Sequence, residues 1–95
     1  MSKNEPAVLL REGIPDLNFS IYPNPAHGYL NIVLEMEEEA HITVLNTPGQ
    51  IIISEKINSI DKTIQINVNE LPAGNYVIKI QTDEMEGHQI FEVIK

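Results

Sequence analysis

The sequence contains no cysteine among its 95 residues. A disulfide framework, a zinc site built on thiolates and a cysteine nucleophile are therefore all excluded. The cellular compartment stays open, because a domain with a sufficient apolar core can persist in an oxidising space without disulfides.

Long apolar runs are also missing. No stretch approaches the roughly 18 consecutive apolar residues of a transmembrane helix, and no apolar segment of the signal-peptide kind follows Met1 to Lys3. With 42% hydrophobic and 21% charged residues, the composition is that of a globular domain. We expect one domain, without direct membrane insertion, that belongs to a longer protein.

Positive charge is scarce. Six basic residues face fourteen acidic ones, which gives a formal net charge of -8. Such a surface repels phosphate backbones and anionic lipid headgroups. Nucleic acid is therefore not an expected partner.

Patterns that carry catalysis or metal binding are absent as well. His27, His41 and His88 show no metal-ligand spacing. The run of glutamates from residue 35 to 39 lacks the aspartate-rich spacing of a calcium loop. There is no Gly-rich phosphate loop and no Gly-x-Ser-x-Gly nucleophile elbow. We expect no enzymatic activity, no cofactor and no metal.

Short alternating segments fill most of the chain after residue 18. In each, apolar side chains recur at a period of two, or β-branched residues dominate, and turn residues stand between the segments. Seven strands are predicted, at 19–22, 29–34, 41–45, 51–57, 62–68, 76–81 and 88–94. Seven short strands at this spacing favour an all-β fold, a seven-stranded immunoglobulin-like antiparallel β-sandwich.

The segment from Leu71 to Tyr76 supports the sandwich. Gly74 suits a sharp turn, and Tyr76 opens an alternating strand with Ile78 and Ile80 on the same face. This is the pattern of a tyrosine corner, in which the phenol OH bonds to backbone just upstream. An ordinary core tyrosine after a loop is the alternative interpretation.

The segments before and between the predicted strands also allow structural predictions. Residues 35–40 are interpreted as an exposed hairpin connection, and residues 82–87 as an acidic turn. Pro48 and Gly49 fit the central positions of a type II turn. Pro23 and Pro25 remove backbone donors, so Tyr22 to Pro25 is expected to be stiff and extended. Residues 1–18 lack a clean period and are interpreted as a linker before a domain at 19–95.

Three motifs in fixed order resemble the C-terminal sorting domain of the type IX (Por) secretion system of Bacteroidota. They are Tyr22-Pro23-Asn24-Pro25-Ala26, then Gly49, then Leu71-Pro72-Ala73-Gly74-Asn75-Tyr76 with a last apolar strand ending at Lys95. The resemblance covers residues 19–95. The Tyr-Pro-Asn-Pro-Ala pentapeptide is its specific element, because a β-sandwich does not require it.

The resemblance implies an immunoglobulin-like export tag. Its implied partners are a cargo domain that precedes it in the same chain, the outer-membrane translocon and a sortase-like cysteine protease that removes the tag. The implied route leads through the periplasm to the cell surface or the medium. The identity of the cargo and the cleavage position stay open.

Two questions stay open at this stage. Tyr22 to Ala26 either closes one end of the sandwich or is recognised directly, since its prolines lower the entropy lost on binding. The competing function is a binding or spacer module inside a larger surface protein. A parent chain that ends at Lys95 and starts with a signal peptide would favour the sorting function.

Overall fold

The computed structural model describes residues 16–34, 39–58 and 63–95, which form strands and turns and contain no helix. All pairings between the strands are antiparallel. The predicted all-β class is confirmed. The strands are β1 (Phe19–Tyr22), β2 (Tyr29–Leu34), β3 (Ala40–Leu45), β4 (Ile51–Ile57), β5 (Thr63–Asn67), β6 (Gly74–Gln81) and β7 (Glu86–Val93).

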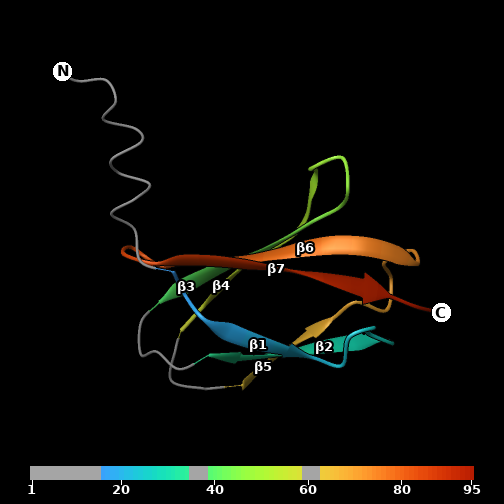
Figure 1. Cartoon of the computed structure of the whole chain (residues 1–95), viewed down its shortest axis with the longest axis horizontal. Helices are drawn as coiled ribbons and strands as arrows, with labels where there is room; N and C mark the ends of the chain where they lie inside the picture. The colour runs from blue at the N-terminus through green and yellow to red at the C-terminus, as the bar shows by residue number, and fades with distance from the viewer. Residues whose placement is uncertain (1–15, 35–38, 59–62) are drawn as a thin grey trace.

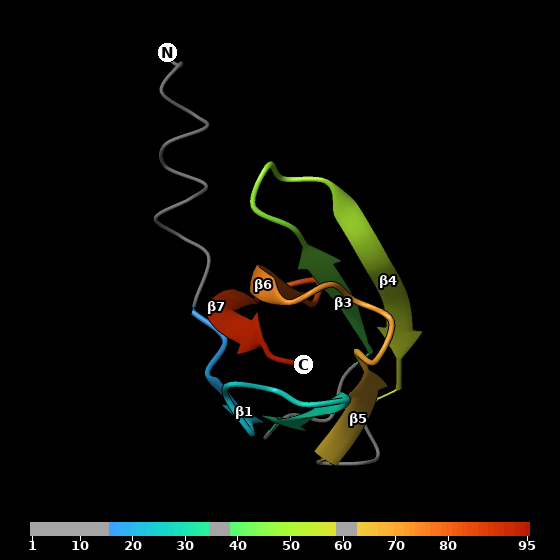
Figure 2. The same cartoon turned by 90° about the vertical axis from the view of Figure 1, so that its right-hand side faces the viewer.

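The strands form two sheets that face each other (Figure 2). One sheet has the order β1-β2-β5, and the other has the order β4-β3-β6-β7. In Figure 2 β7 and β1 lie on one side of the molecule, and β4 and β5 lie on the opposite side. The predicted sandwich is therefore present, with β4 and β7 as the outer strands of its larger sheet.

Alternation along the strands builds the core between the sheets. Leu30, Ile32 and Leu34 of β2 are buried, as are Ile78 and Ile80 of β6. These were the faces that the period of two predicted to be apolar. Each such side chain contributes about 1.5 to 3 kcal/mol when fully buried. The remaining buried apolar residues are Leu17, Phe19, Ala26, Ala40, Ile42, Val44, Ile66, Val68, Tyr76, Phe91 and Val93.

The connection after β2 does not form the expected hairpin. β3 pairs with β4 and β6, whereas β2 pairs with β1 and β5 in the other sheet. The chain therefore crosses from one sheet to the other between β2 and β3, and both strands bury their apolar faces in the shared core. Residues 35–38 themselves lie outside the described residues.

The hairpin between β3 and β4 is present, but its turn lies one position earlier than predicted. The Gly49 N–H donates to the Asn46 carbonyl at 2.9 Å, so Thr47 and Pro48 are the central residues. Gly49 follows the turn with φ of 96°, and the β3–β4 register shifts just beyond it. A turn followed by a left-handed glycine is a common short hairpin loop, and it replaces the predicted type II turn.

Candidate functional site

The chain from Asp16 to Ala26, which we call the covering segment, contacts the outer edge of β7 at its two ends, while β1 between them belongs to the smaller sheet (Figure 1). It forms isolated parallel bridges at both of its ends, Asp16 with Glu86 and Ala26 with Val93. Leu17 donates its N–H to the Glu86 carbonyl at 3.0 Å, and its side chain is only 6% exposed. Residues 16–18, which the sequence assigned to the linker, are thus joined to the sandwich.

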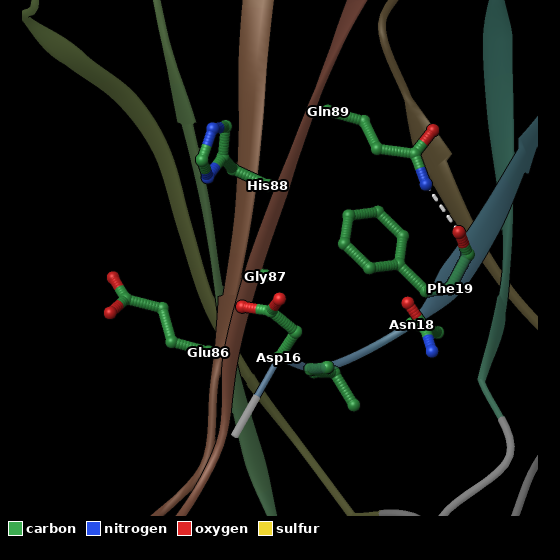
Figure 3. Close-up of a pocket in the computed structure, with 8 residues that line it drawn as sticks. Asp16, Asn18, Phe19, Glu86, Gly87, His88 and Gln89 are labelled. Atoms are coloured by element: carbon green, nitrogen blue, oxygen red, sulfur yellow. Dashed lines mark hydrogen bonds between the residues drawn. The ribbon is translucent and has the colours of Figure 1, made fainter. Parts of the chain in front are cut away.

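Gly87 permits the close approach of Leu17 to β7. A Cβ atom at position 87 would lie 2.2 Å from the Leu17 carbonyl oxygen, which is closer than real Cβ contacts. Figure 3 shows Gly87 beside the start of the covering segment, next to a pocket that Asp16, Glu86 and His88 help to line. The sequence placed this glycine in a turn, but it lies in β7 and serves backbone packing.

The side chain of Asn24 takes the place of a strand partner for β7. Its Oδ1 accepts from the Glu92 N–H at 3.0 Å, and its Nδ2 donates to the Ile90 carbonyl at 3.3 Å. A carboxamide offers one acceptor and one donor group, as a peptide unit does. Asn24 therefore satisfies two backbone groups on an edge that would otherwise face solvent.

Ala26 continues the same edge with its own backbone. Its N–H donates to the Glu92 carbonyl at 2.6 Å, and its carbonyl accepts from the Ile94 N–H at 2.9 Å. Its side chain is fully buried. A larger residue would have no room there, which explains a small side chain at the end of the pentapeptide.

Tyr22, Pro23 and Pro25 lie on the surface around these anchors. The chain bends from Pro23 to Pro25 and is not extended as expected, because Asn24 and Ala26 must both reach β7. Both X-Pro peptide bonds of the motif are cis. Since proline has no N–H, neither residue leaves an unpaired donor on this exposed stretch. The motif combines a fixed backbone with an accessible surface.

A second side-chain contact joins β7 to the covering segment at a residue that precedes Asn24 in the sequence. The Gln89 side chain of β7 donates from Nε2 to the Phe19 carbonyl (Figure 3). Phe19 is buried at the start of β1. This bond therefore connects the outer strands of the two sheets, β7 and β1, across the side that the covering segment closes.

The tyrosine corner is present. Tyr76 is 6% exposed, and its hydroxyl donates to the Pro72 carbonyl at 2.5 Å. Its ring stacks on Phe91 of β7, with centroids 5.7 Å apart. The predicted bond to backbone near Leu71 is therefore confirmed, and it fixes the passage from β5 in one sheet to β6 in the other.

Most of the residues that carry the resemblance meet at one end of the sandwich. Val93 pairs with Gly74 on one side and with Ala26 on the other, so the first and third motifs flank the end of β7. Lys95 then reaches the Asn69 carbonyl with its ammonium group at 2.6 Å, just before Leu71. Gly49 is separate, in the β3–β4 hairpin.

The opposite edge of the larger sheet is open. Among the described residues β4 pairs with β3 alone, and Ile51 and Ile52 on it are large exposed apolar residues. A hollow lies beside β4, where the chain leaves β5. It is lined by Ile52, Ile53, Asn67, Glu70 and Leu71. Sequence reasoning predicted β4 as a strand but gave no sign that it would be an outer one.

The described residues contain no group of three or more histidine, aspartate or glutamate side chains placed to hold a metal ion. In the same part of the chain there is no helix long and apolar enough to cross a membrane.

Comparisons with known proteins agree with this geometry. A search of curated proteins finds no match. Among solved structures, the chain is similar to a DUF3244 family protein with an immunoglobulin-like β-sandwich fold from Bacteroides vulgatus, with a TM-score of 0.65 and 14% identity over 83% of this chain and 97% of that one. The sulfur carrier protein SoxY from Chlorobium limicola is also similar, with a TM-score of 0.51 and 10% identity over 94% and 93% of the two chains. At such identities these likenesses show the fold alone, and they confirm the immunoglobulin-like sandwich.

The family comparison goes further. The family model described as the secretion system C-terminal sorting domain matches residues 20–92, which include the pentapeptide, the hairpin glycine and the tyrosine corner. A type IX sorting domain implies export of its parent protein to the cell surface or the medium. The chain therefore belongs to the family of type IX secretion C-terminal sorting domains.

Proposed function

We propose that the folded domain is recognised as a shape by the outer-membrane translocon of the type IX system. In this proposal the cargo precedes the domain in the same chain and crosses the periplasm before it reaches the surface or the medium. A sortase-like cysteine protease then separates the domain from the cargo. The observation that carries the proposal is the family match over residues 20–92.

The covering segment supports recognition of a fixed shape. Tyr22, Pro23 and Pro25 are exposed, while the neighbouring Asn24 and Ala26 are held by hydrogen bonds to β7. A surface that is already ordered loses little conformational entropy when it binds. The pentapeptide therefore has a structural role through Asn24 and Ala26, and a recognition role is proposed for Tyr22 and the prolines.

The export test uses the full chain. A signal peptide and a soluble reporter are placed before residues 1–95, and the fusion is expressed in a type IX-competent bacterium. We expect the reporter on the cell surface or in the medium. If it stays in the periplasm of a strain that exports its own cargo, the sorting function is wrong and the spacer-module alternative replaces it.

The recognition role needs variants that keep the fold. Tyr22→Ala removes an exposed ring, whereas Asn24→Ala removes two hydrogen bonds to β7 and so changes stability as well. Tyr29→Ala, which removes a similarly exposed ring from β2, is the matched control. Loss of export with Tyr22→Ala but not with Tyr29→Ala supports direct recognition. Equal export of both variants contradicts it.

A further inference from the structure

We propose that the open edge of β4 accepts a strand from a partner protein, and that this strand carries a cationic residue between two apolar residues on its inner face. The inference rests on the proposed function, because the partner is then part of the export machinery. It concerns a different surface from the pentapeptide, on the opposite side of the sandwich (Figure 2).

The register of β4 on β3 gives the pattern on its inner face. Ile53, Glu55 and Ile57 lie opposite Val44, Ile42 and Ala40, which are all buried. Directly opposed residues on neighbouring strands point to the same side of the sheet. Ile53 and Ile57 accordingly pack against the core, and Glu55 lies between them on the face that turns toward the other sheet.

Glu55 is nonetheless exposed, and among the described residues no strand of the smaller sheet pairs with β4. No cation among the described residues forms an ion pair with it. Lys56 is on the outer face and pairs with Glu39 at 3.4 Å. An inward-pointing charge on an outer strand is a device by which natural sheets resist indiscriminate pairing.

A second copy of this chain does not fit the edge. Two β4 strands could pair in antiparallel fashion and continue the sheet. Inner-face residues of one strand would then lie opposite inner-face residues of the other, so Glu55 would lie opposite another Glu55, Ile53 or Ile57. No such register places Lys56 opposite Glu55. Each copy also carries a formal charge of -8, which opposes association. The edge therefore favours a different, cationic partner.

The hollow beside β4 provides the place for an apolar side chain of that partner. Ile52, Ile53 and Leu71 supply apolar walls, and Glu70 contributes a second carboxylate. Backbone hydrogen bonds along an added strand would supply affinity, while the side-chain positions would supply specificity. The complementary partner strand therefore has an apolar, a cationic and an apolar residue at three alternate positions.

A pair of charge-reversal variants tests the proposal in the export assay. Glu55→Lys places like charge opposite the partner's cation, and we expect export to fall by about tenfold or more, since like-charge contacts suppress binding. Glu84→Lys makes the same change in net charge at an exposed position in the turn between β6 and β7, away from both β4 and the pentapeptide, and should export within about twofold of the unaltered chain. Circular dichroism and thermal unfolding check that both variants are folded. Equal export of the two variants would overturn the proposal.

A binding measurement gives a second test that does not depend on export. The probes are two short synthetic peptides that have threonine at every second position. In one peptide the residues between the threonines are valine, lysine and valine, and in the other they are valine, glutamate and valine. Backbone amide shifts of residues 51–57 should respond to the lysine peptide, with roughly tenfold weaker binding of the glutamate peptide. Shifts confined to β7, equal binding of the two peptides, or concentration-dependent pairing of β4 with a second copy would overturn the docking surface. If the unaltered chain fails to export the reporter, the proposed function fails, and the peptides still decide the surface.

Discussion

β7 and β4 occupy equivalent positions, one at each edge of the four-stranded sheet, and their outer edges differ completely. Along β7 the covering segment satisfies backbone groups of Glu86, Ile90, Glu92 and Ile94. Along β4 no segment of the described chain plays this part, and its protection is the charge of Glu55. The pentapeptide therefore occupies the C-terminal part of one edge, whereas in the described part of the chain the outer edge of β4 is left for strand pairing.

The largest effect is expected where the covering segment meets β7 most closely. Gly87→Ala would place a Cβ atom 2.2 Å from the Leu17 carbonyl oxygen and push Leu17 out of the core. We expect a loss of about 3 kcal/mol in the free energy of unfolding, from overpacking and lost apolar burial. Urea denaturation gives the measurement.

A truncated background provides the control for this variant. With residues 1–17 deleted, the Leu17 carbonyl is absent, and Gly87→Ala should change stability by no more than about 0.5 kcal/mol. An equal loss in both backgrounds would show that the glycine serves β7 itself and not the covering segment.

Asn24→Ala should have the next largest effect. It leaves the Glu92 N–H and the Ile90 carbonyl without their side-chain partner, and two exposed hydrogen bonds correspond to about 1 to 2 kcal/mol. Asn58→Ala, at an exposed position just after β4, should cost less than about 0.5 kcal/mol. Amide hydrogen exchange at Glu92 should accelerate in the first variant only. Unchanged exchange there would mean that Asn24 does not close the edge.

Tyr76→Phe weakens the corner and leaves both edges intact. It removes the hydroxyl that donates to the Pro72 carbonyl, and the expected loss is about 0.5 to 1.5 kcal/mol. Phe91 should keep its stacking partner, so the loss should come from the hydroxyl alone. Thermal or urea unfolding measures it, and a neutral substitution would contradict the role of the corner.

The smallest effect is expected on the open edge. Ile51 is 63% exposed on β4, so Ile51→Lys should change stability by less than about 0.5 kcal/mol. Ile90→Lys on β7, where the isoleucine is 66% exposed, is matched in exposure and should behave alike. Urea denaturation of the two variants makes the comparison. A large loss with Ile51→Lys alone would mean that the open edge is covered in solution.

Alternation and turn residues predicted the strands well, because each strand has one face in the core. The period of two assigned Leu30, Ile32 and Leu34 to a buried face without knowledge of the neighbouring strands. The same pattern cannot say which strand lies beside which, so β2 and β3 were expected as a hairpin and lie in different sheets. Strand adjacency depends on contacts far apart in the sequence, and no local signal encodes them.

The candidate site was predicted only in part, because some of its residues also depend on contacts between distant parts of the sequence. The pentapeptide and the corner were found as motifs, and Tyr76 makes the bond that its position predicted. Leu17 and Gly87 were missed, because their roles exist only once residues 69 or more positions apart meet at one edge. Lys95 belonged to the resemblance, and its bond to the Asn69 carbonyl is visible only in the fold.

The direction of the covering segment has a mechanical consequence. Its bridges at Asp16 and Ala26 both run parallel to β7, so the segment and the strand point the same way. Tension between the chain before Asp16 and the end at Lys95 therefore pulls the segment lengthwise along β7. The hydrogen bonds between the covering segment and β7 are then loaded together in shear, so they do not break one after another. We expect the domain to stay folded under a pull from its cargo that would peel away a segment attached in the opposite direction.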